Sequence, residues 1–445
     1  MNKIKDTIFA LSTIEGRSGV AVIRTSGNDA KSIFSYFGIA KIPKPRVAFL
    51  SSIKHPSTKE ILDKGLVLWF PAPNSFTGED VVEFHLHGSR AVIRETIFLL
   101  GKIPGFRHAE PGEFSLRAFE NQKMGLTELE GLADLIDAQT QIQQRQAVRQ
   151  MSGELLNLYE DWRHRILQLL AHVEAYIDFP DEDLPKELSD NFLSQAEDLV
   201  STLSAHLADK RGEIIREGFY AVILGAPNVG KSSLLNYLAK RDVAIVSDIA
   251  GTTRDIIEVH LDLGGYPLTI TDTAGIRESH ESIEQEGIRR ALERAKNADL
   301  KIIMFDATSE NPDKESLKLI DENSIVVINK SELANSPLPI ANSPLPISIK
   351  TGAGLKELLT TLENTLRERL TPSSSPVFTR ERHRISLEEA RTHLNNFTNA
   401  LAKNSPIELC AENLRLAARA LGKITGKIDV EEILGKIFSS FCIGK

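Results

Sequence analysis

The 445-residue sequence contains only two cysteines, Cys410 and Cys442. They cannot form a disulfide framework, and so few cysteines are typical of proteins in a reducing compartment. No apolar run approaches the roughly 20 residues that a membrane-spanning helix needs. The first ten residues lack the apolar stretch of a signal peptide. We therefore expect a cytoplasmic protein that does not enter a membrane.

The sequence also lacks an excess of positive charge. Its formal net charge is −8, so its overall electrostatics does not predict nucleic-acid binding. Any contact with RNA would have to use local basic patches. Hydrophobic residues make up 41% and charged residues 26%, which is typical of water-soluble globular proteins. The length allows about two to four domains.

The most informative stretch is Gly225-Ala-Pro-Asn-Val-Gly230-Lys231-Ser232, which has the spacing G-x-x-x-x-G-K-S. An apolar run precedes it and a helical pattern follows it, so the order predicts a strand, a glycine loop and a helix N-terminus. Such a loop directs backbone N–H groups and the positive end of the helix at a phosphate. Lys231 can reach the β- and γ-phosphates, and the hydroxyl of Ser232 can bind Mg²⁺. A chance glycine turn is the alternative, which the following motifs make far less probable.

Four further motifs follow in the order found in translation-factor-type GTPases. They are Asp248-Ile-Ala-Gly-Thr252-Thr253, Asp272-Thr-Ala-Gly275, Asn329-Lys-Ser-Glu332 and Ser348-Ile-Lys350. Strand patterns at 219–224, 256–263, 267–272, 300–305 and 325–328 alternate with helical patterns. This alternation predicts a doubly wound parallel sheet. Each motif is weak alone, but five in order are specific for a P-loop GTPase.

One position departs from the usual guanine-reading motif. Asparagine and lysine are normally followed two residues later by aspartate, whose carboxylate pairs with the N1 and N2 hydrogens of guanine. Here that residue is Glu332. Its longer side chain can still offer two oxygens, so we expect guanine to be preferred over adenine, with weaker specificity.

The hydrolytic residues also differ from those of Ras-like enzymes, which place glutamine after the D-T-A-G motif to orient water. Ile276 occupies this position and cannot form a hydrogen bond. Glu284 is our candidate for orienting the water, with ordinary surface charge as the competing interpretation. Arg254, Arg277 or a monovalent cation bound by Asn228 could neutralise the transition state.

The N-terminal 118 residues predict a mixed α/β domain, with strands at 20–24, 65–70 and 81–87. Alternation along the last strand directs Glu83, His85 and His87 to one face. A solvated sheet face is the favoured interpretation from the pattern alone, and a ligand site is the alternative. Two histidines without a nearby cysteine make a poor zinc site.

Helical patterns dominate residues 119–216, and they return at 377–445 after a linker at 371–376. We therefore expect one helical domain made from two separated segments. Basic side chains occur at Arg145, Arg149, Arg163 and Arg165, and a solvated helix face is favoured over an RNA-binding patch. A second basic cluster, at Arg380, Arg382 and Arg384, begins the later segment.

A tandem repeat, Ala-Asn-Ser-Pro-Leu-Pro-Ile, occupies residues 334–347. Its four prolines predict an extended surface insertion without regular structure. We favour neutral duplication as its origin.

Several motifs resemble the MnmE (TrmE) family of tRNA-modification GTPases over nearly the whole length. Besides the GTPase motifs they are Gly16-Arg-Ser-Gly-Val20, Pro73-Asn-Ser-Phe-Thr-Gly-Glu-Asp80, Glu110-Pro-Gly-Glu-Phe114, Arg117-Ala-Phe119, Ala133-Asp-Leu-Ile-Asp137 and Phe441-Cys-Ile-Gly-Lys445. The resemblance implies a multidomain α/β plus α protein. Its expected parts are an N-terminal α+β folate-binding and dimerisation domain at 1–118, an inserted P-loop GTPase domain at 217–370, and a discontinuous helical domain at 119–216 and 371–445.

The resemblance also implies a function. Family members hydrolyse GTP while modifying C5 of the wobble uridine (position 34) of certain tRNAs, giving aminomethyl or carboxymethylaminomethyl groups. They form homodimers and work with an FAD-dependent partner, MnmG (GidA), in a heterotetramer or larger complex. A tetrahydrofolate derivative such as 5-formyl-tetrahydrofolate donates one carbon. The sequence itself has no G-x-G-x-x-G fingerprint after a strand, so flavin chemistry has to come from a partner.

The resemblance assigns roles to individual residues. It implies folate contacts at Arg24, Glu83, Lys123 and Lys445; Mg²⁺ ligands at Ser232 and Thr253; K⁺ ligands at Asn228, Ser247, Ile249 and Thr252; and water orientation by Glu284. It implies GTP contacts at Asn228, Val229, Gly230, Lys231, Ser232, Ser233, Ser247, Asp248, Ile249, Ala250, Gly251, Thr252, Thr253, Asp272, Thr273, Ala274, Gly275, Asn329, Lys330, Glu332, Ser348, Ile349 and Lys350. Cys442 matches a retained cysteine, for which catalysis and terminal packing are equal interpretations.

Two other functions stay open at this point. A regulatory or ribosome-assembly GTPase would need neither Arg24, Glu83 and Lys123 nor the Cys442 tail. A folate-using enzyme with a vestigial GTPase would not need Lys231.

Overall fold

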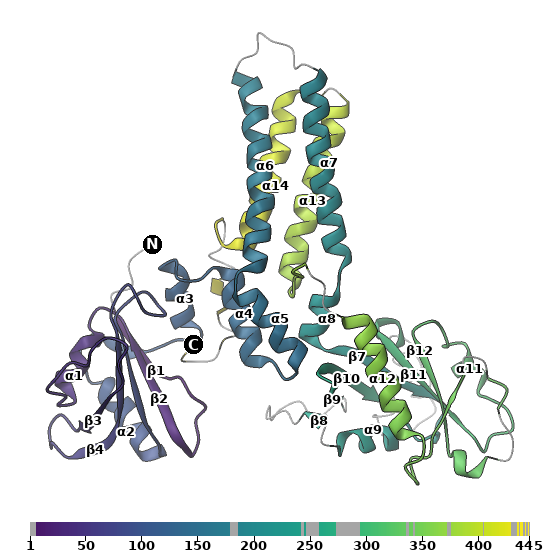
Figure 1. The fold of residues 1–445 in the computed structure, drawn as a ribbon, viewed down its shortest axis with the longest axis horizontal. Helices are drawn as coiled ribbons and strands as arrows, with labels where there is room; N and C mark the ends of the chain where they lie inside the picture. The colour runs from purple at the N-terminus through teal and green to yellow at the C-terminus, as the bar shows by residue number, and fades with distance from the viewer. Residues whose placement is uncertain are drawn as a thin grey trace, which may run out of the picture. The chain divides into compact units, whose positions relative to one another are not determined.

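Figure 1 shows a computed structural model of the chain. The structure describes residues 6–178, 186–241, 244–245, 258–272, 294–334, 338–340, 343–371, 375–403, 405–428, 434–435, 437–438, 441 and 444. The chain divides into two compact units. Unit 1 contains residues 1–133, 151–175 and 411–445, and unit 2 contains residues 134–150 and 176–410.

Unit 1 contains a six-stranded sheet with the order β3-β4-β5-β2-β1-β6. The strands are β1 (Thr7–Leu11), β2 (Ser18–Ser26), β3 (Phe49–Lys54), β4 (Ile61–Phe70), β5 (Val81–Gly88) and β6 (Phe106–His108). All neighbours are antiparallel except β1 and β6. Along β5, Phe84 and Leu86 are buried, whereas His85 and His87 lie on the other face. The predicted alternation of this strand is confirmed.

Helices cover both faces of this sheet. On one face, the 3₁₀ turn η1 (Ala30–Ser32), α1 (Ile33–Tyr36) and α2 (Arg90–Leu100) contribute Phe34 and Leu100 to a core that includes Phe84. On the other face, α3 (Glu113–Glu120) packs Phe114 against Ile8. Each fully buried side chain of this size contributes about 1.5–3 kcal/mol of transfer free energy.

Long amphipathic helices complete unit 1. They are the first part of α4 (Leu126–Asp137), most of α6 (Glu154–Asp178) and most of α14 (Ile407–Thr425). Apolar side chains recur three or four residues apart on α6, where Tyr159, Trp162 and Ile166 are buried. The outer surface carries ion pairs, of which Arg415–Glu174 has an N–O distance of 2.9 Å.

Unit 2 contains a seven-stranded sheet with the order β13-β12-β11-β7-β10-β9-β8. The strands are β7 (Phe219–Gly225), β8 (Ala244–Ile245), β9 (Glu258–Leu263), β10 (Tyr266–Asp272), β11 (Leu300–Asp306), β12 (Ser324–Asn329) and β13 (Leu345–Pro346). On one face, α9 (Lys231–Ala239) and α12 (Leu355–Leu370) pack on a core that includes Ile223. On the other, Val222 and Leu224 join a second cluster with residues such as Leu317 of α11 (Lys314–Leu317). This helix–sheet–helix layering confirms the doubly wound fold class.

The predicted parallel sheet is antiparallel at one edge. The strands from β13 to β10 run parallel, but β9 pairs antiparallel with β10, and β8 antiparallel with β9. Gly264 and Gly265 connect β9 to β10 with φ of 62° and 89°, which most residues avoid. This two-residue turn makes a hairpin, whereas a parallel connection would need a longer crossover.

The prediction that residues 334–347 lack regular structure was also wrong at its end. Leu345 and Pro346 form β13, which pairs with Val327 and Ile328 of β12. Proline is tolerated there because β13 is an edge strand that needs no second set of hydrogen bonds. The second copy of the repeat therefore supplies the edge of the sheet and the fully buried Ile347.

Further helices of unit 2 are α7 (Lys186–Ala208), α8 (Arg211–Glu217), α13 (Glu381–Ala402) and α5 (Gln141–Met151). The basic cluster predicted at the start of α13 is engaged in the structure. Arg384 forms an ion pair with Glu213 and lies 4.8 Å from the ring centroid of Phe378, and Arg380 pairs with Asp134 at 2.7 Å. These arginines hold elements of unit 2 together.

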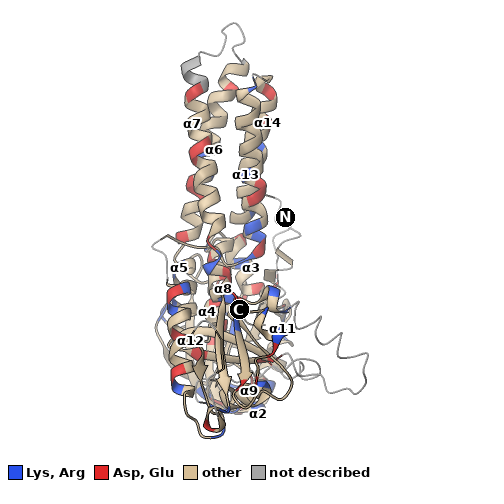
Figure 2. Cartoon of the chain, turned by 90° about the vertical axis from the view of Figure 1, so that its right-hand side faces the viewer, with Lys and Arg blue, Asp and Glu red and all other residues tan. Residues whose placement is uncertain are grey.

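Charged residues of both signs are interspersed along α6, α7, α13 and α14 (Figure 2). This mixture is typical of solvated helix faces. Within the part of the chain that the structure describes, no helix has the length and apolarity needed to cross a bilayer.

Candidate functional site

The glycine loop between β7 and α9 has the backbone that phosphate binding needs. Gly225 and Gly230 have φ of 148° and 106°, and Asn228 has φ of 65°. A Cβ atom at Gly225 would lie 2.4 Å from the carbonyl oxygen of Met304, and one at Gly230 would lie 2.4 Å from Nδ2 of Asn329. Both glycines are therefore required sterically as well as conformationally. The resulting turn ends at the N-terminus of α9, where free N–H groups favour an anion.

Lys231 lies at the centre of this loop. Its Nζ donates hydrogen bonds of 2.9 Å to the carbonyl oxygens of Gly225 and Ala226. The residue is only 8% exposed, and burial lowers the pKa of its ammonium, an effect that nearby Asp272 opposes. Transfer of these donors to phosphate oxygens would place a cation beside the developing charge of phosphoryl transfer.

Ser232 and Asp272 come together at the end of the sheet. Asp272 ends β10, which runs parallel to β7, and its Oδ2 accepts a hydrogen bond from Oγ of Ser232. A hydroxyl next to a carboxylate is a suitable pair of hard oxygen donors for Mg²⁺, directly or through water. The two residues therefore fit the metal site that the motifs predict.

Asn329 connects the phosphate loop to the expected base-reading segment. Its Nδ2 donates to the carbonyl oxygen of Val229 at 2.9 Å, and its Oδ1 accepts from the amide of Ile349 at 3.3 Å. It is 4% exposed at the end of β12. One buried amide thus fixes the spacing between the loop and residues 348–350, which include Lys350.

Glu332 lies in the short turn η2 (Ser331–Leu333) beside Ser348. A hydrogen bond from Ser348 lowers the pKa of the exposed Glu332 carboxyl group. Ser348 is itself 1% exposed, and its Oγ accepts a bond from the amide of Thr351. The hydroxyl therefore orients an ionised carboxylate, which can accept two N–H donors from one base edge.

Sequence reasoning missed Asp306 at the end of β11. Nζ of Lys330 forms an ion pair with its Oδ2 at 2.5 Å, and the hydroxyl of Thr308 donates to its Oδ1. Burial alone would raise the pKa of Asp306, but its bonds from Lys330 and Thr308 lower it overall. The available signal was its place at the carboxyl end of a parallel strand, where α/β sheets form their sites.

Several predicted positions lie outside the described residues. They are Ser247, Asp248, Ile249, Ala250, Gly251, Thr252, Thr253, Arg254, Thr273, Ala274, Gly275, Ile276, Arg277, Glu284, Cys442 and Lys445.

A second polar site lies on the sheet of unit 1. Arg24 and Glu83 are register partners in β2 and β5, and the Nε–Oε1 distance of their ion pair is 2.9 Å. Nε2 of His85 lies 3.2 Å from the other oxygen of Glu83. The Arg24 guanidinium lies 5.7 Å from the ring centroids of both Phe76 and Phe114. The structure thus holds Glu83 in a fixed orientation on the face that α3 covers.

Lys123 is an exposed cation after α3, and its Nζ donates to the carbonyl oxygen of Pro73 at 2.9 Å. Together the three residues offer two cations and a carboxylate. A pterin presents an amino group and a ring N–H to a carboxylate, and a glutamyl tail carries carboxylates for lysine or arginine. The residues present therefore fit a folate.

The motifs at 110–114 and 117–119 have a structural role that sequence reasoning did not recognise. Arg117 is 1% exposed and bonds to Glu79 at 2.9 Å and to Glu113 at 3.0 Å. Burial would raise the pKa of Glu113, but bonds from Arg107, the backbone of Glu110 and Arg117 lower it. This buried network fixes α3 against the loop of residues 73–80.

The geometry in unit 2 defines a P-loop nucleotide-binding protein of the GTPase class: a phosphate loop after a parallel strand, a serine–aspartate pair and an asparagine–lysine loop at the same sheet edge. The chain belongs to the MnmE (TrmE) family. The family description "GTP-binding protein TrmE N-terminus" matches residues 7–123, and "MnmE helical domain" matches residues 126–442.

Curated relatives match over the full length. A protein of Paramagnetospirillum magneticum is 49% identical over 447 aligned positions, covering 99% of this chain and all of the relative. Proteins of Wolbachia from Drosophila simulans and of Rickettsia akari are 48% and 47% identical, covering 100% and 99% of this chain and all of each relative. All three bear the name "tRNA modification GTPase MnmE".

Proposed function

We propose that this chain is the GTP-hydrolysing subunit of the system that modifies C5 of the wobble uridine in tRNA. It is a GTPase, and its full-length relatives are named as tRNA modification GTPases. The observation that supports this assignment best is the presence of two polar sites on one chain. The phosphate loop at Lys231 belongs to unit 2, and the Arg24–Glu83 pair belongs to unit 1.

In the nucleotide site, Lys231 and the loop amides bind the phosphates, and Asn329, Glu332 and Ser348 bind guanine. Ser232, with Thr253, holds Mg²⁺, which neutralises phosphate charge. Asn228, with Ser247, Ile249 and Thr252, binds K⁺ in place of an arginine finger, and Glu284 orients water. The proposed nucleotide contacts also include Val229, Gly230, Ser233, Asp248, Ala250, Gly251, Asp272, Thr273, Ala274, Gly275, Lys330, Ile349 and Lys350.

In the folate site, Glu83 accepts hydrogen bonds from the pterin, and the ion pair with Arg24 orients that carboxylate. Lys123 and Lys445 bind carboxylates of the tail. The folate supplies a one-carbon unit, and flavin chemistry comes from the FAD-dependent MnmG partner. The chain acts as a cytoplasmic homodimer. Its domains are the folate-binding domain at 1–118, the helical domain at 119–216 and 371–445, and the GTPase domain at 217–370. Cys442 has either a catalytic role or a packing role.

GTP hydrolysis changes conformation in this scheme and does not itself make the new bond on uridine. Binding of the γ-phosphate, Mg²⁺ and K⁺ supplies free energy that can close the paired GTPase domains of the dimer over the nucleotide. Hydrolysis then lets the GTPase domains separate. A chain that only regulated ribosome assembly would not need the Arg24–Glu83 site.

Nucleoside mass spectrometry of tRNA from a strain that lacks the gene tests the proposal. We expect the C5 groups of wobble uridines to disappear, to return with the wild-type gene, and to stay absent with Lys231→Ala. Unchanged wobble uridines in the deletion strain would reject the proposal in favour of a regulatory or ribosome-assembly GTPase.

A further inference from the structure

The sequence motif Ala133–Asp137 has no part in either site, but one of its residues, Asp134, bonds to several separate segments of unit 2. Oδ1 of Asp134 accepts from Nε of Arg216 at 3.0 Å and from NH2 of Arg380 at 2.7 Å. Its Oδ2 accepts a longer bond of 3.4 Å from the hydroxyl of Thr379. The Asp134 carboxylate is 12% exposed, so removal of its charge would leave two arginines without their shared partner.

The partners of Asp134 lie where the chain enters and leaves the nucleotide-binding fold. Arg216 is in α8, three residues before β7 begins, and β7 leads directly to the phosphate loop. Arg380 is the N-cap of α13, after α12 has completed the fold. One carboxylate on α4 therefore binds both ends of the inserted fold.

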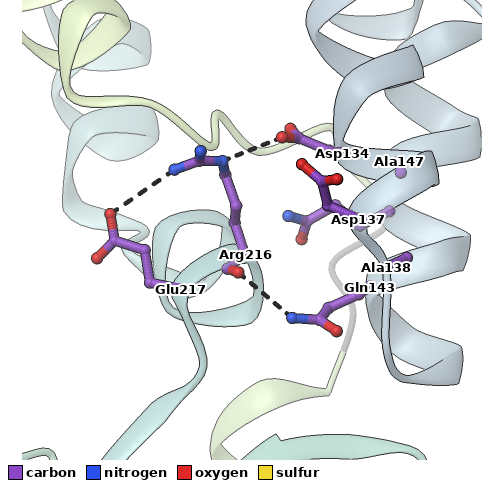
Figure 3. Close-up of a pocket in the computed structure, with 8 residues that line it drawn as sticks. Asp134, Asp137, Ala138, Gln143, Ala147, Arg216 and Glu217 are labelled. Carbon is purple, nitrogen blue, oxygen red and sulfur yellow. Dashed lines mark hydrogen bonds and ion pairs between the residues drawn. The ribbon is translucent and has the colours of Figure 1, made fainter. Parts of the chain in front are cut away.

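Figure 3 shows a cavity of about 300 Å³ beside Asp134. The ion pair between Asp134 and Arg216 forms part of its lining, and Gln143 of α5 donates from Nε2 to the carbonyl oxygen of Arg216 at 3.3 Å. Gln146 donates in the same way to the carbonyl oxygen of Gly212 at 2.9 Å. Segment 134–150 is thus fastened to α8 by side chains from both α4 and α5.

A second connection joins this segment to the phosphate loop through the sheet. At one end of β10, Asp272 accepts the hydrogen bond from Ser232. At the other end, the carbonyl oxygen of Gly265 accepts a bond of 3.0 Å from the amide of Ile142. Between them β10 is a paired strand of seven residues, which spans roughly 20 Å. Ile142 is also buried in the core of the fold.

We propose that Asp134 is a positioning residue that makes α4 respond to the nucleotide in the GTPase site. The response runs from the Ser232–Asp272 pair along the β9–β10 hairpin to α5, and from the phosphate-loop strand through α8 to Asp134. Helix α4 begins in unit 1 and ends in unit 2, with the division between Ala133 and Asp134. A helix that crosses this division transmits a displacement because its backbone is continuous. The inference rests on the proposed function only in assuming that the nucleotide bound in unit 2 is GTP.

Hydrogen exchange with mass spectrometry on the full chain tests this route, comparing GDP with a non-hydrolysable GTP analogue in Mg²⁺ and K⁺. In the wild type we expect peptides from both 126–137 and 138–150 to change their exchange with the nucleotide. Asp134→Asn keeps the shape of the side chain and removes its charge. We expect this variant to bind the analogue and keep the change at 138–150, but to lose the change at 126–137.

Asp137→Asn is the matched control, because Asp137 lines the same cavity on the same helix and its side chain has no bond to a described residue. It should behave as the wild type. Arg216→Met is the second variant, because it leaves Asp134 paired with Arg380, and it should lose the same response even if Asp134→Asn does not fold.

A wild type that binds the analogue without a change at 126–137 would overturn the inference and leave the proposed function intact. Retention of that change in both Asp134→Asn and Arg216→Met would also overturn it. A wild type that binds no guanine nucleotide would overturn both proposals.

Discussion

The phosphate loop gives Lys231 an environment that suits a phosphate contact. The loop buries a cation, lowers its pKa, and offers it carbonyl oxygens as neutral partners. Burial of a cation costs stability, and the negative charge of Asp272 offsets only part of that cost, which a bound phosphate would offset further. Burial of this lysine is therefore consistent with a role in binding rather than in packing.

We predict that Lys231→Ala lowers kcat/KM for GTP by about 10²- to 10³-fold, because the variant loses the cation that faces the transferred phosphate. Phosphate release under steady-state conditions measures the change. Lys240→Ala, at the exposed C-terminal end of the same helix, is the control and should behave as the wild type. Wild-type kcat/KM in Lys231→Ala would contradict the assignment of the phosphate site.

Glu332 should decide the choice of base. The 2-amino group distinguishes guanine from hypoxanthine, and a carboxylate that accepts from it rejects the analogue without it. We expect Glu332→Ala to reduce the preference for GTP over ITP by about 10- to 100-fold, because it removes charge-assisted hydrogen bonds. Competition binding measures the ratio.

Glu332→Asp puts aspartate at the position where the guanine-reading motif usually has it. This variant should keep the preference for GTP. Glu322→Ala, at an exposed position after α11, is the control. If the ratio of GTP to ITP affinity did not change in Glu332→Ala, Glu332 would not read the base.

At the scale of the elements, the contact between α7 and the segment that leads into α13 should depend on pH. His206 of α7 is half-buried next to Phe378, with ring centroids 5.3 Å apart, and desolvation lowers its pKa to about 4. The unfolded chain protonates this histidine near pH 6.5, and the folded chain does so only near pH 4. Stability from the neutral ring is therefore complete above pH 6.5 and is lost as the pH falls towards 4.

We predict a loss of up to roughly 3 kcal/mol over this window, from the size of the shift. Hydrogen exchange of α7 and α13 between pH 7 and pH 4.5 measures it. His206→Phe cannot take up the proton and should show a smaller change. Equal pH dependence in wild type and His206→Phe would reject His206 as the cause.

The repeat at 334–347 makes a prediction about a strand. Only the second copy contributes β13 and the buried Ile347, whose amide donates to Ile328 at 2.8 Å. Since the copies are identical, removal of either leaves one that can supply both. We expect this deletion to change GTP affinity little, within about threefold, because residues 348–350 keep their anchor.

Removal of both copies is the control, and it should weaken GTP binding because Ser348 loses the strand that precedes it. Nucleotide titration of both deletions measures the difference. If the single deletion weakened binding as much as the double deletion, the first copy would have a role of its own.

At the scale of the molecule, the two polar sites belong to separate compact units, so their binding functions should separate. We predict that Arg24→Ala loses tetrahydrofolate binding and keeps GTP hydrolysis, because Glu83 loses its fixed partner. Lys231→Ala should show the opposite. Both variants should fail to restore wobble-uridine modification, because the product requires both sites.

Equilibrium dialysis with 5-formyl-tetrahydrofolate and phosphate release measure the two functions separately. Arg90→Ala, at the exposed start of α2, controls for loss of positive charge. Parallel loss of both functions in Arg24→Ala would mean that the substitution acts on the whole fold and not on a site.

The sequence alone determined the class of protein, because spacing carries the chemistry of a phosphate loop. A phosphate loop needs these residue types at this spacing, which here are Gly225, Gly230, Lys231 and Ser232. Alternation of apolar and polar residues also revealed β5, since side chains repeat every two residues in a strand. Alternation of strand patterns with helical patterns revealed the doubly wound layering. The pattern of charged residues likewise predicted that the long helices have solvated faces.

The tertiary structure decided what depends on partners distant in the chain. It showed that Glu83, which the sequence placed only on a polar face, is the ion-pair partner of Arg24 on the neighbouring strand. The two residues are 59 positions apart in the chain. It showed an antiparallel edge where a sequence pattern could not give strand direction. It divided the chain inside α4, between Ala133 and Asp134, where no change of composition occurs. Motif spacing and periodicity can be read from neighbouring residues in the sequence. The pairing of buried charges joins residues that are distant in the chain, so it is determined only when the chain has folded.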